Sequence, residues 1–289
     1  MIVEEYPHFD IQKTAESGQC FRLNRIGDHE WLLIAYGKVL QITMERKGRY
    51  CFSCGRKEFD SLWKDYFDLE TDYGKFAERI PKKDLFLQKA AAFSDGIRIL
   101  RQDPWETLIS FIISQRKSIP AIQTSVEKLS AAFGKKIPAG TKTYYAFPRP
   151  EELSRADYDD ILACSVGYRA PYIYRAAKMC ASGELDLMSL SELDDAALRE
   201  KLLSVNGVGE KVAGCVMLFG YHRTGAFPVD VWIQRMIDLH YDGHFPLKRY
   251  RGFAGIIQQY IFYYGRQTYD RSERMRMKIE KLDKKGSLI

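Results

Sequence analysis

Hydrophobic and polar positions along the first third of the chain follow a pattern typical of β-strands. Two apolar runs, at 31–36 and 39–44, flank a plausible turn at 37–38, which predicts a hairpin, and a further short strand is expected at 50–53. From about Asp84 the apolar residues recur instead at spacings of three and four, which is the period of a helix. We therefore expect a β-rich segment followed by a helical one.

Local signals mark where several of these helices begin and end. Asp103 precedes Pro104, with Glu106 three residues after it, which is the pattern of a capped helix start. Ser118 can cap a second helix, which carries a proline in its first turn and which Gly134 ends. Further helices are predicted at 169–182, 194–204 and 253–265.

These patterns together predict an α+β protein with two main parts. We expect an N-terminal β-rich domain at 1–95, a mostly α-helical domain at 96–277 and a charged C-terminal tail at 278–289. The charged tail is more typical of a solvated segment than of a DNA-binding arm. A chain of 289 residues is long enough for two or three such subdomains.

Charge and cysteine spacing narrow the class of protein further. A net charge of +6 is compatible with a phosphate-rich partner but does not by itself indicate one. Of the six cysteines, Cys51 and Cys54 form the one C-x-x-C pair, which fits neither a zinc site nor an iron–sulfur cluster. We expect reduced thiols, no signal peptide and no membrane span. We find no P-loop and no dinucleotide fingerprint, so nothing favours a small-molecule enzyme.

The segment 202–239 is the one from which a chemical activity can be argued. The end of one helix is followed by Gly207-Val208-Gly209, and two glycines two residues apart permit a tight turn with close backbone approach. The next helix opens with free N–H groups, which favour binding of a phosphate. This helix-hairpin-helix pattern suits sequence-independent DNA binding, although an ordinary helical hairpin has the same spacing.

Lys211 is an unusual residue for the first turn of that second helix. The helix N-terminus already carries partial positive charge, which favours the neutral form of an amine, and a neutral amine is what a nucleophilic lysine requires. Cys215 lies four residues on and shares a helix face with Lys211. Asp230 is placed to cap the helix 231–239 and could face the lysine. A phosphate-binding lysine, a core cysteine and an ordinary cap remain alternatives.

Three separate segments then show a family resemblance. Gly207-Val208-Gly209, Lys211 and the Pro-Val-Asp motif ending in Asp230 resemble the helix-hairpin-helix DNA glycosylase superfamily, in which the lysine marks the bifunctional branch. The segments 17–22 (SGQCFR) and 167–170 (GYRA) resemble the 8-oxoguanine DNA glycosylase/AP lyase family within it. The resemblance extends from residue 17 to about 266.

The resemblance implies a fold and a reaction. The fold would be a twisted antiparallel β-sheet domain followed by a helical glycosylase domain, with the helix-hairpin-helix at about 196–220. Lys211 would attack C1′ of the damaged nucleotide, release the base and form a Schiff base that permits β-elimination. Asp230 would stabilise the positive charge that builds on the sugar. The substrate would be an 8-oxoguanine turned out of duplex DNA during base excision repair.

The resemblance also assigns a pocket for the base. Cys215 and Phe262 match its two faces, and Gln258 matches the residue that reads the Watson–Crick edge. Gly18 matches the carbonyl that accepts a hydrogen bond from N7–H, a proton that guanine lacks. Without the resemblance, a core phenylalanine and a surface glutamine are the simpler interpretations.

Contacts with the rest of the DNA are implied for a larger set of residues. Tyr168 and Arg169 match the wedge and the reader of the orphaned base. The full set of implied DNA contacts is Arg116, Lys117, Tyr168, Arg169, Gly207, Gly209 and Trp232. The backbone carbonyls of Leu203, Val205 and Val208 match positions that hold a monovalent cation, Na⁺ or K⁺, in the hairpin. No other cofactor is implied.

Three positions depart from the family pattern. Arg116 stands where an asparagine fills the space left by the base, and Ala121 stands where a second arginine grips the opposite cytosine. Trp232 replaces a histidine near the phosphate. These changes leave the chemistry in place, so we expect weakened discrimination for cytosine opposite the lesion.

Two other functions compete with this interpretation. A monofunctional glycosylase for alkylated bases, of the 3-methyladenine type, would use Asp230 with water and would not need Lys211. A non-catalytic helix-hairpin-helix DNA-binding module would leave Asp230, Gln258 and Phe262 unexplained as a set. For the glycosylase/lyase we expect a monomer that acts on double-stranded DNA, in the cytoplasm of a prokaryote.

Overall fold

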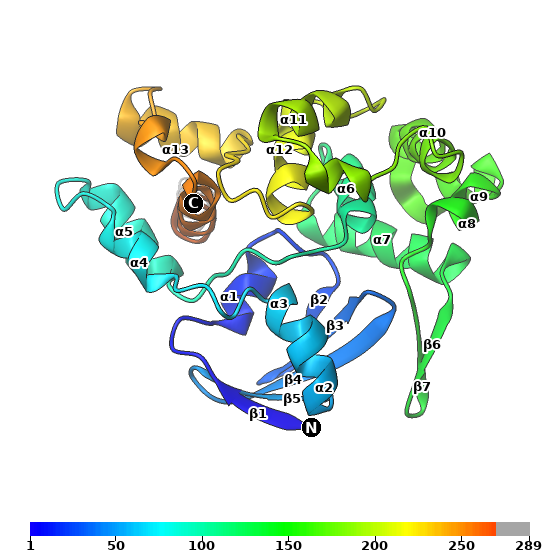
Figure 1. The fold of residues 1–289 in the computed structure, drawn as a ribbon, viewed down its shortest axis with the longest axis horizontal. Coiled ribbons are helices and arrows are strands. Elements are labelled where there is room, and N and C mark those ends of the chain that lie inside the picture. The colour runs from blue at the N-terminus through cyan, green and yellow to red at the C-terminus, as the bar shows by residue number, and fades with distance from the viewer. Residues whose placement is uncertain (270–289) are drawn as a thin grey trace, which may run out of the picture.

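A five-stranded antiparallel sheet forms the N-terminal layer of the molecule; it contains the predicted hairpin and the short strand near 50–53, and two strands, at 2–5 and 23–27, that the sequence pattern missed. The computed structural model describes residues 1–269, and Figure 1 shows the sheet beneath a layer of helices. The strands lie in the order β1-β5-β4-β3-β2. Their bounds are β1 Ile2–Glu5, β2 Leu23–Gly27, β3 Glu30–Ala35, β4 Lys38–Arg46 and β5 Arg49–Phe52.

The hairpin between β3 and β4 turns one residue earlier than the sequence predicted. A turn at 37–38 was expected, but Lys38 already pairs with Ala35 in the ladder. Tyr36 and Gly37 have φ of 51° and 71°. Two successive positive φ angles make the type I′ turn, whose twist matches that of antiparallel strands, so the predicted turn was wrong by one position.

One face of the sheet is buried against short helices that the strand pattern did not reveal. Trp31 from β3 and Trp63 from the helical segment are 1% and 0% exposed and belong to the same core. The predicted onset of helices near Asp84 was therefore late. The helices of this layer are α1 Ile11–Glu16, α2 Arg56–Glu58, the π-helical turn η1 Phe59–Trp63 and α3 Lys64–Tyr66.

The second layer is helical and holds the larger hydrophobic core. Its helices are α4 Gly74–Glu78, α5 Leu85–Ser94, α6 Pro104–Ser114, α7 Ile119–Phe133, α8 Pro150–Ser154, α9 Tyr158–Ile161, α10 Ala170–Ala181, α11 Asp195–Leu203, α12 Glu210–Phe219, α13 Val231–Tyr241 and a helix at 254–269. Short 3-10 or π turns are η2 Leu162–Val166, η3 Gly167–Arg169, η4 Ser189–Glu192 and η5 Leu247–Tyr250.

Side-chain caps explain why some of these helices begin where the sequence places them, although Ser118, the predicted cap of α7, forms no capping hydrogen bond. Asp103 accepts a hydrogen bond from the Glu106 N–H at 2.8 Å, and α6 starts at Pro104 as predicted. Asp194 caps α11 in the same way through the Ala197 N–H at 2.8 Å. The last helix was predicted at 253–265 and occupies 254–269. The predicted tail at 278–289 lies outside the described residues.

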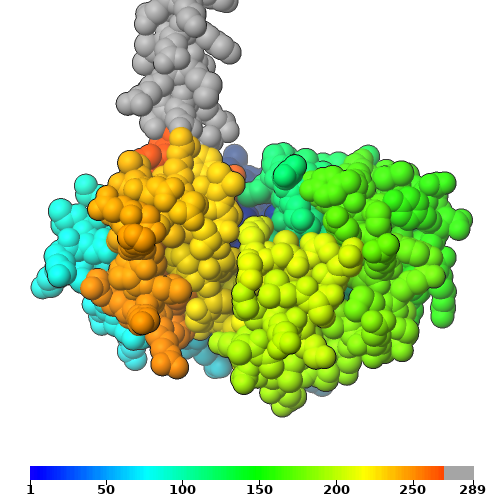
Figure 2. Space-filling model, turned by 90° about the horizontal axis from the view of Figure 1, so that it is seen from above, coloured from blue at the N-terminus to red at the C-terminus, as the bar shows by residue number. Residues whose placement is uncertain are grey.

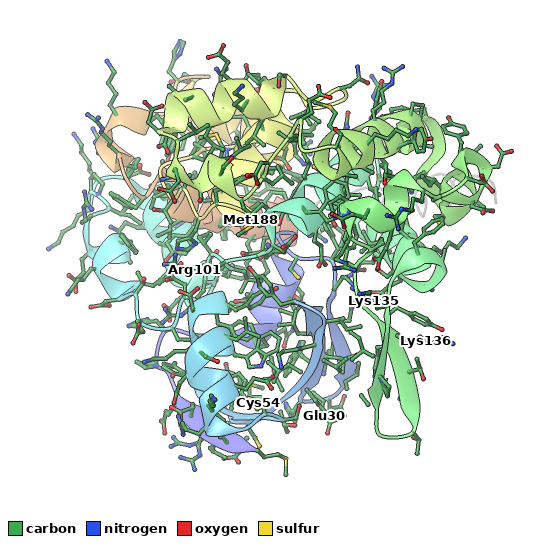
Figure 3. The ribbon with its side chains drawn as sticks, turned by 45° about the vertical axis from the view of Figure 1, so that its right-hand side comes forward. Glu30, Cys54, Arg101, Lys135, Lys136 and Met188 are labelled. Atoms are coloured by element: carbon green, nitrogen blue, oxygen red, sulfur yellow. The ribbon has the colours of Figure 1, made fainter. Side chains whose placement is uncertain are left out.

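Ion pairs and packing contacts join the two layers. Arg101 forms ion pairs with Asp65 at 3.2 Å and Asp68 at 3.0 Å, and Figure 3 shows it between the sheet-side helices and the helical layer. Segment 73–91 packs into the helical core, while Leu100 packs into the sheet core. The chain thus crosses between the layers more than once, which fixes their relative placement.

A second hairpin, which the sequence pattern missed, projects beside the sheet. It consists of β6 Lys136–Ala139 and β7 Lys142–Tyr145. Figure 3 shows Lys135 and Lys136 where this hairpin leaves the body of the molecule. Within the described residues, no helix is long and apolar enough to cross a membrane.

Candidate active site

A large cleft opens between two groups of helices. It measures about 1780 Å³ and is lined by the end of α6, the start of α7, one side of α12 and of α13, and the helix at 254–269. Figure 2 shows the hollow between the yellow and orange α13 region and the green α6–α7 region. Nine of the predicted residues line it: Gly18, Arg116, Lys117, Lys211, Cys215, Asp230, Trp232, Gln258 and Phe262.

The helix-hairpin-helix is present at the predicted place, and its glycines differ in role. Gly207 has φ of 85°, a region that L side chains rarely adopt, and it packs tightly against Tyr172. Gly209 is the N-cap residue of α12 and has a φ of −101°. A Cβ atom on it would meet no atom within 4 Å. The first glycine therefore shapes the turn, while the second leaves the backbone N–H groups of α12 accessible from outside.

Lys211 lies in the first turn of α12, and its amine reaches the end of α6. The Nζ atom donates to the Ser114 hydroxyl at 3.2 Å and lies 4.8 Å from the centroid of the Phe111 ring. Both partners sit on one face of α6 and come from about a hundred residues earlier in the chain. Neither partner could be predicted from the sequence, because only the packing of α6 on α12 brings them to the lysine. The amine is therefore held at a fixed place in the cleft.

Cys215 forms part of the wall beside that amine. Its side chain is 4% exposed, and burial raises the pKa of the thiol to about 11, although the neighbouring Lys211 opposes the rise. The residue is therefore a neutral thiol rather than a thiolate near neutral pH. The predicted shared face of Lys211 and Cys215 is confirmed.

Asp230 begins α13 and faces the cleft. Its carboxylate accepts the Ile233 N–H at 2.8 Å, which confirms the predicted cap. Burial raises the pKa of Asp230, while the Ile233 N–H and the charge of Lys211 act in the opposite direction. Within residues 1–269 the two side chains form no direct ion pair, so each remains available to a third group placed between them.

Gly18, Gln258 and Phe262 line one part of the cleft, which we call the recess. Gly18 has φ of 74°, and a Cβ atom on it would approach Cε1 of Phe262 to 3.2 Å, so these two residues lie against each other. Gln258 is 4% exposed, which contradicts the simple interpretation of a surface glutamine. Its amide donates to the Pro228 carbonyl at 3.1 Å and accepts from Gln259 at 3.0 Å. The predicted pocket residues are thus brought together at one site.

Two neighbouring loops carry the other predicted residues: the loop with Arg116 and Lys117 lines the cleft, whereas Tyr168 and Arg169 are not among the residues that line it. Arg116 is exposed, and Tyr168 is 54% exposed. Arg169 is only 5% exposed and donates hydrogen bonds to the carbonyls of Gln115 and Val166. Lys117 is half-buried with its amine bonded to residues of the protein. Tyr168 and Arg116 therefore project outward, whereas Arg169 and Lys117 point into the loops.

Trp232 and the hairpin carbonyls complete the predicted set. Trp232 lies in the first turn of α13, with the guanidinium of Arg235 5.7 Å from its ring centroid. Leu203, Val205 and Val208 lie at the turn between α11 and α12, where the Val205 carbonyl accepts the Val208 N–H at 3.0 Å. Within residues 1–269 there is no group of His, Cys, Asp or Glu side chains that could hold a metal ion.

Family models match nearly the whole described chain. Residues 1–108 match the N-terminal domain of 8-oxoguanine DNA glycosylase, and residues 109–244 match the HhH-GPD superfamily of base excision DNA repair proteins. A "Probable N-glycosylase/DNA lyase" of Methanothermobacter thermautotrophicus is 32% identical over 297 residues, covering 90% of this chain and 94% of the relative.

Solved structures of DNA glycosylases are similar to this chain in fold. The 8-oxoguanine glycosylase/lyase of Clostridium acetobutylicum, in complex with double-stranded DNA containing cytosine opposite 8-oxoguanine, has a TM-score of 0.86 and 33% identity. That match covers 93% of this chain and 99% of the other. A 3-methyladenine DNA glycosylase from Archaeoglobus fulgidus has a TM-score of 0.73 at 19% identity, which is a likeness of fold.

Proposed function

The chain belongs to the 8-oxoguanine DNA glycosylase family, and on that premise we propose how its own residues carry out base excision. It is an N-glycosylase/DNA lyase for 8-oxoguanine. The rival alkylated-base glycosylases share the fold at lower identity, and a non-catalytic binding module would not need the cleft described above. The observation that carries the residue assignment is that Lys211, Asp230 and Cys215 line the same cleft and lie near enough to influence one another's charge.

The proposed substrate is duplex DNA that contains the oxidised base, which in a prokaryotic cell lies in the nucleoid. The damaged nucleotide turns out of the stack, at a cost of a few kcal/mol, and enters the recess between Cys215 and Phe262. The Gly18 carbonyl would accept N7–H, and Gln258 would exchange its bond to Pro228 for the edge of the base. Guanine offers no N7–H, so it would leave a buried acceptor without a partner.

The chemical step then follows from the amine and the carboxylate. The Nζ of Lys211, after giving up a proton, attacks C1′, the N-glycosidic bond breaks, and the base leaves with the bonding electrons and takes up a proton. Asp230 stabilises the positive charge that develops on the sugar, because its carboxylate is held in place by the cap of α13. Opening of the sugar ring gives the Schiff base between Lys211 and C1′. Loss of a C2′ proton then expels the 3′ phosphate.

A monovalent cation at the hairpin is part of this proposal. The carbonyls of Leu203, Val205 and Val208 come from one turn, and uncharged oxygen donors of this kind suit Na⁺ or K⁺. When bound, the ion would add positive charge next to the accessible N–H groups of α12, where a DNA phosphate would bind.

Reductive trapping tests the proposal directly. The protein is incubated with a duplex that carries 8-oxoguanine opposite cytosine, and borohydride is added. We expect a covalent protein–DNA adduct, its loss in Lys211→Gln, and its retention in Lys201→Gln, which removes an exposed lysine of α11. Base release without an adduct would contradict the role of Lys211, and absence of base release by the unaltered protein would contradict the proposed reaction.

A further inference from the structure

The loop between α6 and α7, which lines the cleft, and a second loop bonded to it each hold a non-glycine residue with a left-handed backbone. Arg116 has φ of 52°, between α6 and α7, and Ser165 has φ of 64°, just before the loop that carries Tyr168. This conformation is unfavourable for residues other than glycine and persists where the surroundings enforce it. The contacts of the two loops show what enforces it.

Lys117 is the centre of the first set of contacts. Its Nζ donates to the Ser165 carbonyl and to the Ser125 hydroxyl, both at 2.5 Å, and that hydroxyl donates to the same carbonyl at 3.0 Å. Lys128 on α7 adds a bond to the Ser165 hydroxyl at 2.8 Å. Three side chains of the α7 segment thus converge on one strained residue of the neighbouring loop.

Arg169 provides the reverse contact from the second loop to the first. Its guanidinium donates to the carbonyl of Gln115, and the Gln115 side chain in turn donates to the Gly207 carbonyl at 3.0 Å. The same guanidinium lies 4.3 Å from the centroid of the Tyr168 ring. The exposed ring of Tyr168 therefore stands on a loop that is bonded to the Arg116 loop at two places and, through Gln115, to the hairpin.

The surroundings of Lys117 do not resemble those of a phosphate-binding lysine. Two of its ammonium protons already serve acceptors within the protein, and the side chain is half-buried. Burial lowers the pKa of Lys117, and the positive charges of Arg169 and Lys128 lower it further. A lysine kept for DNA would instead hold its charge out in solvent.

We infer that Lys117 is a positioning residue for strand intrusion: it fixes Ser165 and thereby sets Tyr168 and Arg116 in the geometry needed to fill the space that the extruded base leaves. This role rests on the proposed function. It replaces the phosphate contact that the family resemblance implied for Lys117, and it assigns the contact with DNA to Tyr168 and Arg116 alone among these residues.

The substitution Lys117→Met tests the inference because methionine keeps most of the length and removes the ammonium. Two quantities are measured on a duplex with 8-oxoguanine opposite cytosine: the single-turnover excision rate at saturating enzyme, and the salt dependence of binding. We expect the rate to fall about tenfold, the effect of losing a charge-assisted hydrogen bond, with the slope of log K against log salt unchanged. Lys89→Met, on the exposed face of α5 and outside the cleft, should change neither quantity.

If Lys117 binds a DNA phosphate instead, the two measurements should change in a different way. A lysine that contacts a phosphate lowers the salt slope by about 1 when it is removed and leaves the saturated rate as it was. Either that result or an unchanged rate in Lys117→Met would overturn the inference. The unaltered protein serves as the reference: if it releases no base, the proposed function fails, whereas an active unaltered protein with an equally active Lys117→Met refutes the positioning role alone.

A second pair of variants keeps the inference testable if Lys117→Met melts early. Ser165→Gly accepts the left-handed backbone and retains the carbonyl that Lys117 binds, whereas Ser165→Val disfavours that backbone. We expect excision at saturating enzyme to be slower in Ser165→Val than in Ser165→Gly, with equal salt slopes. Equal rates for the two variants, at matched thermal stability, would show that the backbone of residue 165 does not position the intruding side chains.

Discussion

Replacement of glycine by alanine should have different effects at Gly207 and at Gly209, the two glycines of the hairpin. A Cβ atom on Gly207 would lie 2.4 Å from Cγ of Tyr172, far inside the 3.5–4.0 Å at which carbon atoms pack. The φ of 85° at this position adds a penalty for any L side chain. A Cβ on Gly209 would meet nothing within 4 Å, at a φ of −101°.

The magnitudes follow from these two environments. For Gly207→Ala, overpacking costs about 1–3 kcal/mol and the left-handed backbone about 1–2 kcal/mol, so we expect a loss of about 2–5 kcal/mol in the free energy of unfolding. For Gly209→Ala, the change is that of a helix cap and should stay below about 1 kcal/mol. The added methyl group nevertheless stands where a DNA phosphate would approach α12, so binding should weaken although the fold does not.

Urea unfolding followed by circular dichroism, together with equilibrium binding to an undamaged duplex, separates the two effects. Gly207→Ala should unfold at lower urea than Gly209→Ala, and Gly209→Ala should bind DNA less tightly than the unaltered protein. Equal urea midpoints for the two variants would refute the packing argument at Tyr172. Undiminished DNA binding by Gly209→Ala would refute the assignment of the α12 N-terminus as a phosphate site.

Three further predictions concern the catalytic carboxylate, a buried acid and the opposite base. Asp230→Asn keeps the cap of α13, so we expect the free energy of unfolding to change by less than about 0.5 kcal/mol. The single-turnover excision rate should fall about 10²- to 10³-fold, because the variant lacks the negative charge. A stable variant with full activity would contradict the role of that charge. Burial raises the pKa of Glu106 from 4.5 to about 8, so the folded state binds the proton more tightly than the unfolded state, and the free energy of unfolding should fall as pH rises between these values. Glu106→Gln should flatten that dependence in urea titrations at pH 5 and pH 8, and an unchanged pH dependence would rule out this residue as its source. Ala121 lies in the first turn of α7 and cannot grip the opposite base, so the excision rate should depend only weakly on that base. Ala121→Arg should increase the preference for cytosine. A strong preference for cytosine in the unaltered protein would contradict this prediction.

Features set by neighbouring residues could be predicted from the sequence. The start of α6 at Pro104, the cap by Asp230 and the shared face of Lys211 and Cys215 each depend on residues no more than four positions apart. The order of sheet and helical layers followed from hydrophobic periods that extend over tens of residues. These signals survive folding because tertiary packing reinforces them.

Features set by long-range packing could not be predicted in the same way. Nothing in the sequence pairs Lys211 with Ser114, because the two approach only when α12 packs on α6. The left-handed backbone of Ser165 has no local cause and depends on Lys117, far away in the chain. The identification of Lys117 as a DNA contact came from its place in a motif, whereas its contacts point inward.

The thiol in the wall of the cleft has a consequence for when the enzyme works. 8-Oxoguanine accumulates under oxidative conditions, and the same oxidants attack cysteine through its thiolate form. Cys215 is buried, and its pKa of about 11 leaves very little thiolate at neutral pH. Under the proposed function, the pocket would place a soft, polarizable sulfur atom against the base while exposing little of the thiolate that oxidants attack.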